Sequence, residues 1–342
     1  MGFPEADYVV EETYNNIKNS LNSTLSTEYL NPLDMLISAK FMCRGVVGTT
    51  FTITNNDKLC KQIVVMITDS SVIIDAQNNL RMEIIPVPLG SYSVKIELQD
   101  MTTTKNIDIT EAGRPYYIAY TLSALLKRFT DNGTFTVPDI GNAHLLLTAA
   151  GAGGGGGSGG WGRSDYKEHN AGGGGGGGGA AVSLQKINKN VGTKINITIG
   201  KGGTGGTYST SGFWYNDGSD GGAGGSTIVE GVITLPGGNA GGGSTSNGGV
   251  GGAPGGSGGG YGGNGGPYTG KGYDGNAGIL GAGGKTNGSN SSGGGGGGSI
   301  GNGGSCDSSN SGVNGGGGAG GTRDGGTGGK GVVEFYKGVI VV

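Results

Sequence analysis

Short runs of apolar residues, some alternating with polar residues and two wholly apolar, lie between residues 40 and 120, which is the pattern of half-buried and fully buried β-strands. Turn-forming residues such as Asn, Asp, Gly and Pro separate the runs at intervals of about ten residues. The six runs are 51–54, 63–67, 72–74, 92–98, 107–109 and 116–118. Regularly spaced short strands are typical of β-sandwiches. We therefore expect residues 40–120 to form a small β-sandwich.

A different periodicity precedes this stretch. Apolar residues recur at helical spacing on one side of residues 5–30, at Val10, Tyr14, Ile17, Leu21 and Leu25. The pattern predicts an amphipathic helix within an N-terminal segment 1–39. Two interpretations remain open: the helix attaches or oligomerises the protein, with a trimer as the favoured assembly, or it packs on its own domain.

The pattern changes again after residue 120. Residues 121–128 are predicted to be a short helix or linker. Of the 85 glycines in the 342-residue chain, seven precede residue 151 and one follows residue 331, so the rest lie in 151–331. Ordering a glycine costs about 0.5–1 kcal/mol more than ordering an alanine. The region is therefore either disordered or held by an unusual compensating structure.

Repeated Gly-Gly-x triplets favour an ordered structure. They occur at 202–207, 221–226, 248–253, 262–267 and 325–330, and β-branched runs interrupt them at 195–199 and 227–233. A period of three matches the polyproline-II geometry, which makes no internal hydrogen bonds. Its backbone groups must find partners elsewhere. We expect a bundle of polyglycine-II helices carried by a second β-sandwich in a domain covering 129–342.

Charge and reactive residues exclude several functions. The net charge is −3 without a basic run, so we expect no nucleic-acid partner. The three cysteines are widely spaced and only two histidines are present, so we expect neither a metal site nor a cofactor. Cys43 and Cys60 either pair or are two small core residues. No stretch is long and apolar enough to insert in a membrane, and no catalytic constellation is evident. We expect a protein that is not an enzyme.

Two parts of the sequence resemble proteins of bacterial viruses. The run 88–96, Pro-Leu-Gly-Ser-Tyr-Ser-Val-Lys-Ile, followed by 105–110, resembles small immunoglobulin-like modules of phage tail proteins. Residues 129–138, the strand and glycine run at 144–153, the glycine run 172–179 and the closing strand 331–336 follow the order of glycine-rich domains in phage tail-fibre and receptor-binding proteins. The chain departs from that order in its extra tail, 337–342.

The resemblance implies a virion adhesin that is synthesised in the host cytoplasm and recognises a bacterial surface glycan or outer-surface protein. Residues 1–128 would attach it to other tail or baseplate proteins. The alternative is a structural virion protein, a head fibre or baseplate decoration, with the glycine-rich domain as a rigid spacer.

Aromatic residues in the loops between glycine runs are the candidate receptor-binding residues. Rigid aromatic side chains beside Asp and Asn suit the recognition of sugars and protein surfaces. The alternative is that they cap the bundle. The candidates are Trp161, Tyr166, Tyr208, Phe213, Trp214, Tyr215, Asp217, Tyr268 and Tyr273.

Overall fold

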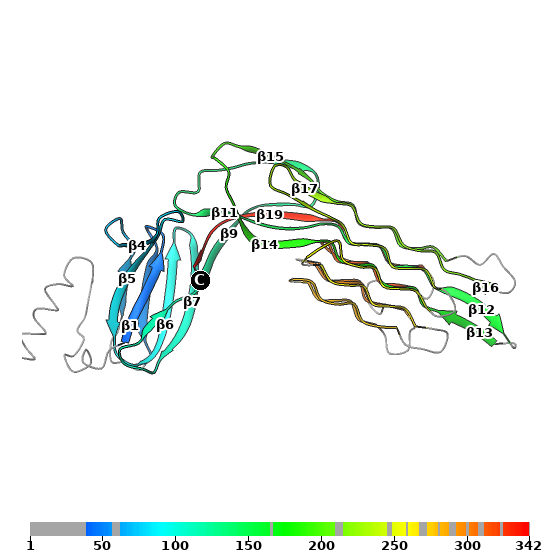
Figure 1. Cartoon of the computed structure of the whole chain (residues 1–342), viewed down its shortest axis with the longest axis horizontal. Coiled ribbons are helices and arrows are strands. Elements are labelled where there is room, and N and C mark those ends of the chain that lie inside the picture. The colour runs from blue at the N-terminus through cyan, green and yellow to red at the C-terminus, as the bar shows by residue number, and fades with distance from the viewer. Residues whose placement is uncertain are drawn as a thin grey trace, which may run out of the picture. The chain divides into compact units, whose positions relative to one another are not determined.

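The protein is mainly β, as predicted. The computed structural model describes residues 39–56, 62–164, 167–208, 215–244, 248–257, 259–266, 272–279, 281–286, 292–298, 301–306, 311–321 and 324–341. Strands and no helices occur in these ranges (Figure 1). The helix predicted at 5–30 lies outside the described residues.

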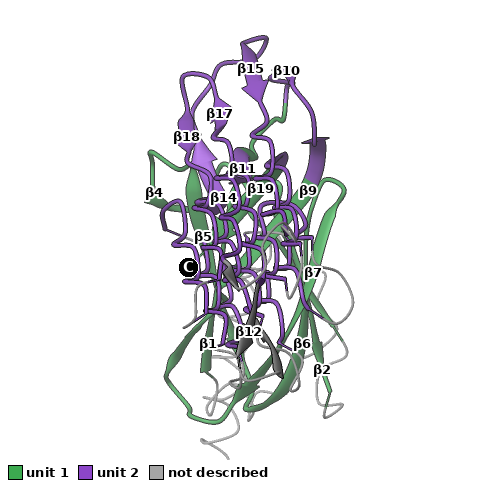
Figure 2. Cartoon of the chain, turned by 90° about the vertical axis from the view of Figure 1, so that its right-hand side faces the viewer, with its two compact units in different colours: residues 1–124, 140–144, 337–342 green, residues 125–139, 145–336 purple. Residues whose placement is uncertain are grey.

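The chain divides into two compact units that each contain separate stretches of sequence (Figure 2). Unit 1 comprises residues 1–124, 140–144 and 337–342, and unit 2 comprises 125–139 and 145–336. The prediction of a linker or short helix at 121–128 is wrong, because these residues lie within strand β9 (Tyr120–Phe129). Strand β9 and strand β19 (Val332–Val341) both contribute residues to each unit.

Unit 1 contains two four-stranded sheets with the orders β4-β5-β1-β8 and β3-β2-β6-β7. All the predicted strands are present, and two more, β1 and β5, complete the first sheet. The strands are β1 (Ala39–Gly45), β2 (Thr50–Asn55), β3 (Ile63–Met66), β4 (Val72–Asp75), β5 (Leu80–Val87), β6 (Gly90–Leu98), β7 (Met101–Ile109) and β8 (Pro115–Tyr117). Neighbouring strands in these two sheets are antiparallel except for β1 and β8, which are parallel.

The two sheets of unit 1 share one hydrophobic core. Strands β2 and β6 bury alternate residues, so each presents one face inward. The rings of Phe41 and Tyr92 meet edge to face across the core, with centroids 6.4 Å apart. The Tyr92 hydroxyl donates a hydrogen bond of 2.8 Å to the carbonyl oxygen of Pro88. This bond explains the spacing of proline and tyrosine in the 88–96 motif.

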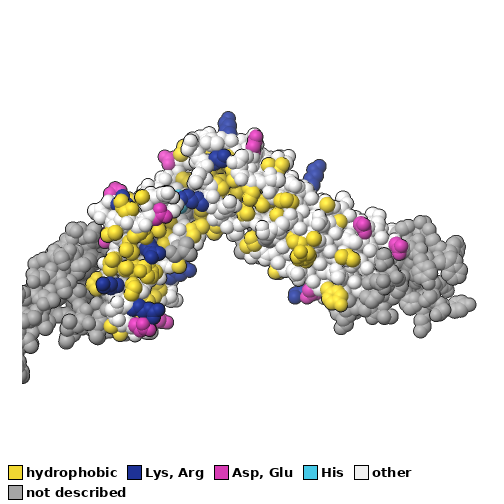
Figure 3. All heavy atoms as spheres, in the orientation of Figure 1, with side chains coloured by type: hydrophobic (Ala, Val, Ile, Leu, Met, Phe, Trp, Pro, Cys, Tyr) yellow, Lys and Arg dark blue, Asp and Glu magenta, His cyan; other side chains and the backbone are white. Residues whose placement is uncertain are grey.

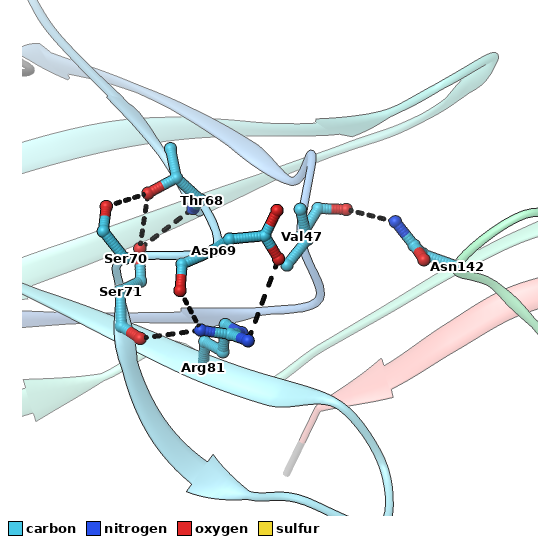
Figure 4. Close-up of polar contacts among 7 residues, drawn as sticks. All are labelled: Val47, Thr68, Asp69, Ser70, Ser71, Arg81 and Asn142. Atoms are coloured by element: carbon cyan, nitrogen blue, oxygen red, sulfur yellow. Dashed lines mark hydrogen bonds and ion pairs between the residues drawn. The ribbon is translucent and has the colours of Figure 1, made fainter.

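Polar side chains form hydrogen bonds with backbone carbonyl oxygens in unit 1 (Figure 4). The Arg81 guanidinium donates to the carbonyl oxygens of Asp69 and Ser71, the latter at 3.2 Å. The Asn142 amide donates to the carbonyl oxygen of Val47 at 3.3 Å. Residues 140–144 therefore hydrogen-bond within unit 1 although they follow the start of unit 2 in sequence.

Unit 2 begins with β-sheets that provide the base for its glycine-rich part. Their orders are β10-β15-β17-β18 and β14-β11-β19-β9. The new strands are β10 (Gly133–Thr136), β11 (His144–Ala150), β14 (Ala181–Ile187), β15 (Lys194–Thr198), β17 (Thr227–Val229) and β18 (Ile233–Leu235). Phe335 of β19 is fully buried and stacks on Phe135 of β10, with ring centroids 3.9 Å apart. Phe335 thereby joins the two sheets.

Glycine segments run side by side from this base (Figures 1 and 2). We call them the glycine segments and name each by its residues. They are 151–158, 172–180, 200–207, 218–226, 236–244, 248–257, 259–266, 272–279, 281–286, 292–298, 301–306, 315–321 and 324–331. They contain no α-helix and no β-strand, and hydrogen bonds between segments connect their backbones.

The segment 151–158 illustrates the pattern with a period of three. Successive N–H groups at 154, 155 and 156 donate to three different segments, at Gly177, Gly222 and Gly326, over 2.8–2.9 Å. The carbonyl oxygens of the same three residues accept from Gly318, Gly241 and Gly206, on three further segments. Segment 151–158 is therefore hydrogen-bonded to six neighbours, which satisfy the groups that an extended backbone leaves free.

Close approach of the backbones, rather than left-handed conformation, requires the glycines. Within the described part of 151–331, positive φ angles occur at only four glycines: 192, 231, 248 and 315. A Cβ atom placed on Gly155 would lie 1.8 Å from the carbonyl oxygen of Thr204, and one on Gly156 would lie 2.0 Å from that of Ala319. Both obstacles are backbone atoms, so no side-chain rotation relieves the clash.

The glycine pattern of each segment follows its position in the bundle. Segments 151–158, 172–180, 292–298 and 315–321 are buried along their described length and consist almost wholly of Gly and Ala. The outer segments 200–207, 281–286 and 324–331 expose one residue in three. In 200–207, for example, Lys201, Thr204 and Thr207 are exposed, whereas Gly203 and Gly206 are buried. Uninterrupted glycine therefore marks the inside of the bundle, and Gly-Gly-x marks its outside.

Candidate functional site

The candidate site lies at the end of the glycine bundle away from the base sheets of unit 2. Hydrogen bonds between segments place the ends of several segments at the same level along the bundle. The Ser158 N–H donates to the Ser219 carbonyl oxygen at 2.9 Å, and the Ser244 N–H donates to the Ser158 carbonyl oxygen at 3.0 Å. The Ser158 hydroxyl donates to the Thr207 carbonyl oxygen at 3.0 Å. We call this the distal end.

A small three-stranded sheet extends from the distal end. Its order is β13-β12-β16, with β12 at Gly160–Ser164, β13 at Lys167–Ala171 and β16 at Tyr215–Asn216. Trp161 is the register partner of Asn170 and of Asn216, and Gly162 is the partner of Tyr215. The two aromatic loops singled out in the sequence therefore meet through their backbones in one sheet.

The structure describes only some of the predicted recognition residues. Tyr166, Phe213, Trp214 and Tyr268 lie outside the described residues, and only the backbone is described for Trp161 and Tyr215. Tyr208 is partly buried, and its N–H donates to the Asp324 carboxylate at 2.8 Å. Asp217 is exposed at the distal end, and Tyr273 is 66% exposed on the outer segment 272–279. Among these described residues, no hydrogen bond or ring contact joins one to another.

Serine hydroxyl groups connect the segments at the distal end through hydrogen bonds. Ser158 is fully buried, and its hydroxyl oxygen accepts a 2.7 Å hydrogen bond from the Ser219 N–H. The Ser219 hydroxyl oxygen in turn accepts from the Thr207 N–H at 2.8 Å. Sequence reasoning missed this cluster. Its signal is the single serine that interrupts the glycine run at 158, where the run reaches the end of the bundle.

Side chains of the outer segments replace backbone acceptors at the bundle surface. Asp, Asn and Ser at exposed or half-buried positions each accept a hydrogen bond from a backbone N–H of an adjacent segment. The acceptor–donor pairs are Asp220 with Gly243, Asn264 with Gly251, Asn302 with Ala282, Ser305 with Lys285 and Asp274 with Thr286, at 2.7–2.9 Å. These polar residues therefore have a structural role that composition did not indicate.

Asp274 has the most elaborate of these environments. Its carboxylate accepts hydrogen bonds from the Thr286 N–H and hydroxyl and from the Lys285 ammonium, the last at 3.1 Å. The Thr286 N–H, together with the other donors, lowers the pKa of Asp274 below its ordinary value of 3.8. The carboxylate is therefore charged at neutral pH, and its charge is balanced by Lys285.

Reactive and metal-binding groups are sparse. No group of three or more His, Cys, Asp or Glu residues close enough to hold a metal ion occurs among the described residues. Cys43 and Cys306 form no disulfide with a described residue, and burial raises the pKa of the Cys43 thiol. Cys60, its possible partner, lies outside the described residues. In the part of the chain that the structure describes, no helix is long and apolar enough to cross a membrane.

Comparison with known proteins identifies no family for this chain. Neither a protein-family model nor a curated protein sequence matches this chain.

Proposed function

We propose that the chain is a virion adhesin, the tip of a phage tail fibre, that recognises a bacterial surface molecule through aromatic loops on a rigid glycine-rich frame. The proposal extends the sequence resemblance. The observation that carries it is the pairing of β12 with β16 at the distal end, since the loops to which these two strands belong, 161–169 and 207–217, hold both tryptophans of the chain.

We propose further that the glycine segments are polyglycine-II helices. Three features support this assignment: a hydrogen-bond period of three, six neighbours around segment 151–158, and the scarcity of positive φ angles among the described glycines. A frame of this kind has little conformational freedom, because every inner segment is fixed by its neighbours. Loops attached to it are held in place before binding, which lowers the entropic cost of recognition.

Unit 1 is the proposed attachment part, with other tail or baseplate proteins as its partners. The bond from Tyr92 to the Pro88 carbonyl oxygen resembles the tyrosine corner of immunoglobulin-like sandwiches and supports the predicted resemblance to them. A helical N-terminal segment and a trimeric assembly remain predictions.

An adsorption assay tests the adhesin proposal. A variant with Trp161, Phe213, Trp214 and Tyr215 replaced by alanine is expected to bind host cells about a hundredfold or more weakly, because buried aromatic contacts contribute a few kcal/mol to an interface. The control is Tyr117→Ala, which removes a 52% exposed tyrosine from unit 1. Equal adsorption of parent and variant, at unchanged melting temperature, would refute recognition by these loops.

The same assay distinguishes the adhesin from the alternative, a structural virion protein in which the glycine-rich domain is a rigid spacer. In that case the parent protein binds no host cells, while particles lacking it are unstable or fail to assemble. Antibody labelling of particles against the glycine-rich region would then mark the head or baseplate instead of the fibre tip.

A further inference from the structure

A second surface of unit 2 lies on the side of the bundle, apart from the distal loops. Three neighbouring outer segments, 248–257, 259–266 and 272–279, form this face. The N–H groups of Gly262 and Gly265 donate to the carbonyl oxygens of Gly252 and Gly249, and the register is antiparallel. On the other side, the N–H groups of Tyr273 and Asn276 donate to the carbonyl oxygens of Asn264 and Tyr261. We call it the lateral face.

The hydrogen-bond register places tyrosines and asparagines in alternating positions. Tyr261 lies opposite Asn276, and Asn264 lies opposite Tyr273. Each tyrosine is thus followed along its own segment by an asparagine three residues later, about 9 Å away at the rise of this geometry. Tyr261 is 56% exposed and Tyr273 is 66% exposed. Both asparagines are exposed as well.

Only glycines stand between Tyr261 and Asn264 on segment 259–266, whereas the exposed Asp274 follows Tyr273 on segment 272–279. Gly262 and Gly263 separate Tyr261 from Asn264, so no side chain of segment 259–266 fills the space between the aromatic ring and the amide.

The face carries no unbalanced charge. The only charged residue in its three segments is Asp274, whose carboxylate is paired with Lys285 in the adjoining segment at 3.1 Å. Nothing in these segments would attract an anionic polymer. Tyrosine rings stack on the C–H faces of sugar rings and keep a hydroxyl for hydrogen bonding. Amide side chains both donate and accept, as sugar hydroxyl groups require.

We propose that the lateral face binds a neutral polysaccharide, with Tyr261 and Tyr273 stacking on its sugar rings and Asn276 hydrogen-bonding its hydroxyl groups. Asn264 already accepts a hydrogen bond from the Gly251 N–H at 2.7 Å, so its amide nitrogen is the group left to donate. The inference rests on the proposed adhesin function and assigns it a ligand class and a second contact surface along the bundle.

An array of purified bacterial surface polysaccharides, neutral and acidic, provides the test, followed by affinity measurements on the polysaccharide that binds best. The parent chain is expected to bind neutral polysaccharides. The double variant Tyr261→Ala, Tyr273→Ala is expected to bind at least about tenfold more weakly, because it loses two stacking contacts. Asn276→Asp, which keeps the shape of the side chain and adds a charge, is expected to weaken binding as well.

The control for these variants is again Tyr117→Ala, which is expected to bind like the parent. Both tyrosines of the double variant are exposed, so its melting temperature should match that of the parent. Binding of the double variant with parental affinity overturns the inference, and so does a parent chain that binds no neutral polysaccharide on the array. Self-association of the parent that the double variant abolishes would identify a second copy as the occupant instead.

These outcomes are distinguishable from failure of the adhesin proposal. A parent chain that adsorbs to cells through its distal loops but binds no polysaccharide refutes only the lateral face. A chain that binds polysaccharide through the lateral face but whose distal-loop variant adsorbs normally refutes only the distal site.

Discussion

The N–H of Gly176 donates a hydrogen bond of 2.8 Å to the carbonyl oxygen of Gly318. Gly176 also accepts a bond of 2.9 Å from the Gly296 N–H, so one residue ties three glycine segments together. A Cβ atom on Gly176 would lie 2.1 Å from the carbonyl oxygen of Gly154, on a fourth segment. The interior of the bundle is therefore held by main-chain groups at distances that exclude any side chain.

The first prediction concerns this interior. Gly176→Ala is expected to lower the free energy of unfolding of unit 2 by about 3 kcal/mol or more, because the added methyl group forces backbones apart. Calorimetric melting would measure the effect. The matched control is Thr204→Ala, which shortens an exposed side chain in an outer segment and should change stability by less than about 0.5 kcal/mol. Similar melting of the two variants would contradict the close-packed interior.

The second prediction concerns amide exchange. Amides of 151–158 and 172–180 donate to other segments and are buried, so their hydrogen exchange in the intact chain is expected to be slow, on the order of hours or longer. Mass spectrometry of deuterated peptides would measure it. Exchange within seconds throughout these two runs would mean that the glycine segments are not stably bonded in solution.

The glycine bundle was predictable because its signal repeats. The Gly-Gly-x triplets indicated a period of three, and the order of strands and glycine runs indicated a base from which the segments extend. Which segments lie inside was also present in the sequence, since runs without a third-position side chain are the buried ones. That rule could be recognised only once the hydrogen bonds around 151–158 were known.

Strand β9 was missed for a physical reason. The run 121–128 contains Ala, Leu, Lys and Arg, which favour helices, and Leu125 and Leu126 stand side by side instead of alternating. Its strand conformation depends on pairing with β19, which is distant in sequence. Such non-local pairing overrides local preference. A deletion ending at residue 128 would therefore remove a strand from the base sheet, and it is unsuitable for testing attachment.

The candidate site was predictable only in part. Pairing of β12 with β16 shows that Trp161 and Tyr215 lie on neighbouring strands, a relationship that no sequence pattern indicated. The structural roles of Asp220, Asn264 and Asp274 could not be predicted, because each depends on a backbone N–H of a segment that only the folded bundle brings close. Aspartate and asparagine beside aromatic residues were interpreted as recognition groups in the sequence, and several of them also complete the bundle surface.

The third prediction concerns the base of unit 2. Phe335→Ala removes a ring that stacks on Phe135 and meets Phe129 edge to face at a centroid distance of 6.2 Å. It is expected to cost about 3–5 kcal/mol of unfolding free energy, which is typical for truncation of a buried phenylalanine. The control is Leu125→Ala, since Leu125 is 53% exposed on β9. Chemical denaturation would compare the two, and a loss below about 1 kcal/mol for Phe335→Ala would show that the sheets are held by other contacts.

The last prediction separates the two ways in which Asp274 can stabilise the bundle surface. Its carboxylate has a lowered pKa in the folded protein, chiefly because the Thr286 N–H donates to it. A carboxyl group with a lowered folded pKa stabilises the fold above its unfolded pKa, and the contribution disappears as the pH falls through the folded pKa. The relevant window therefore lies below the ordinary value of 3.8.

Two variants distinguish charge from hydrogen bonding. Asp274→Asn keeps an oxygen that can accept from the Thr286 N–H but removes the charge that attracts Lys285, whereas Asp274→Ala removes both. At pH 7 the melting temperature is expected to fall in the order parent, Asp274→Asn, Asp274→Ala. As the pH is lowered below 3.8 and the carboxylate is protonated, the parent and Asp274→Asn are expected to converge while Asp274→Ala stays lower, because protonation leaves a carbonyl acceptor in place. A gap between parent and Asp274→Asn that persists unchanged at low pH would contradict the role of the charge, and equal melting of both variants at pH 7 would contradict the role of the hydrogen bond.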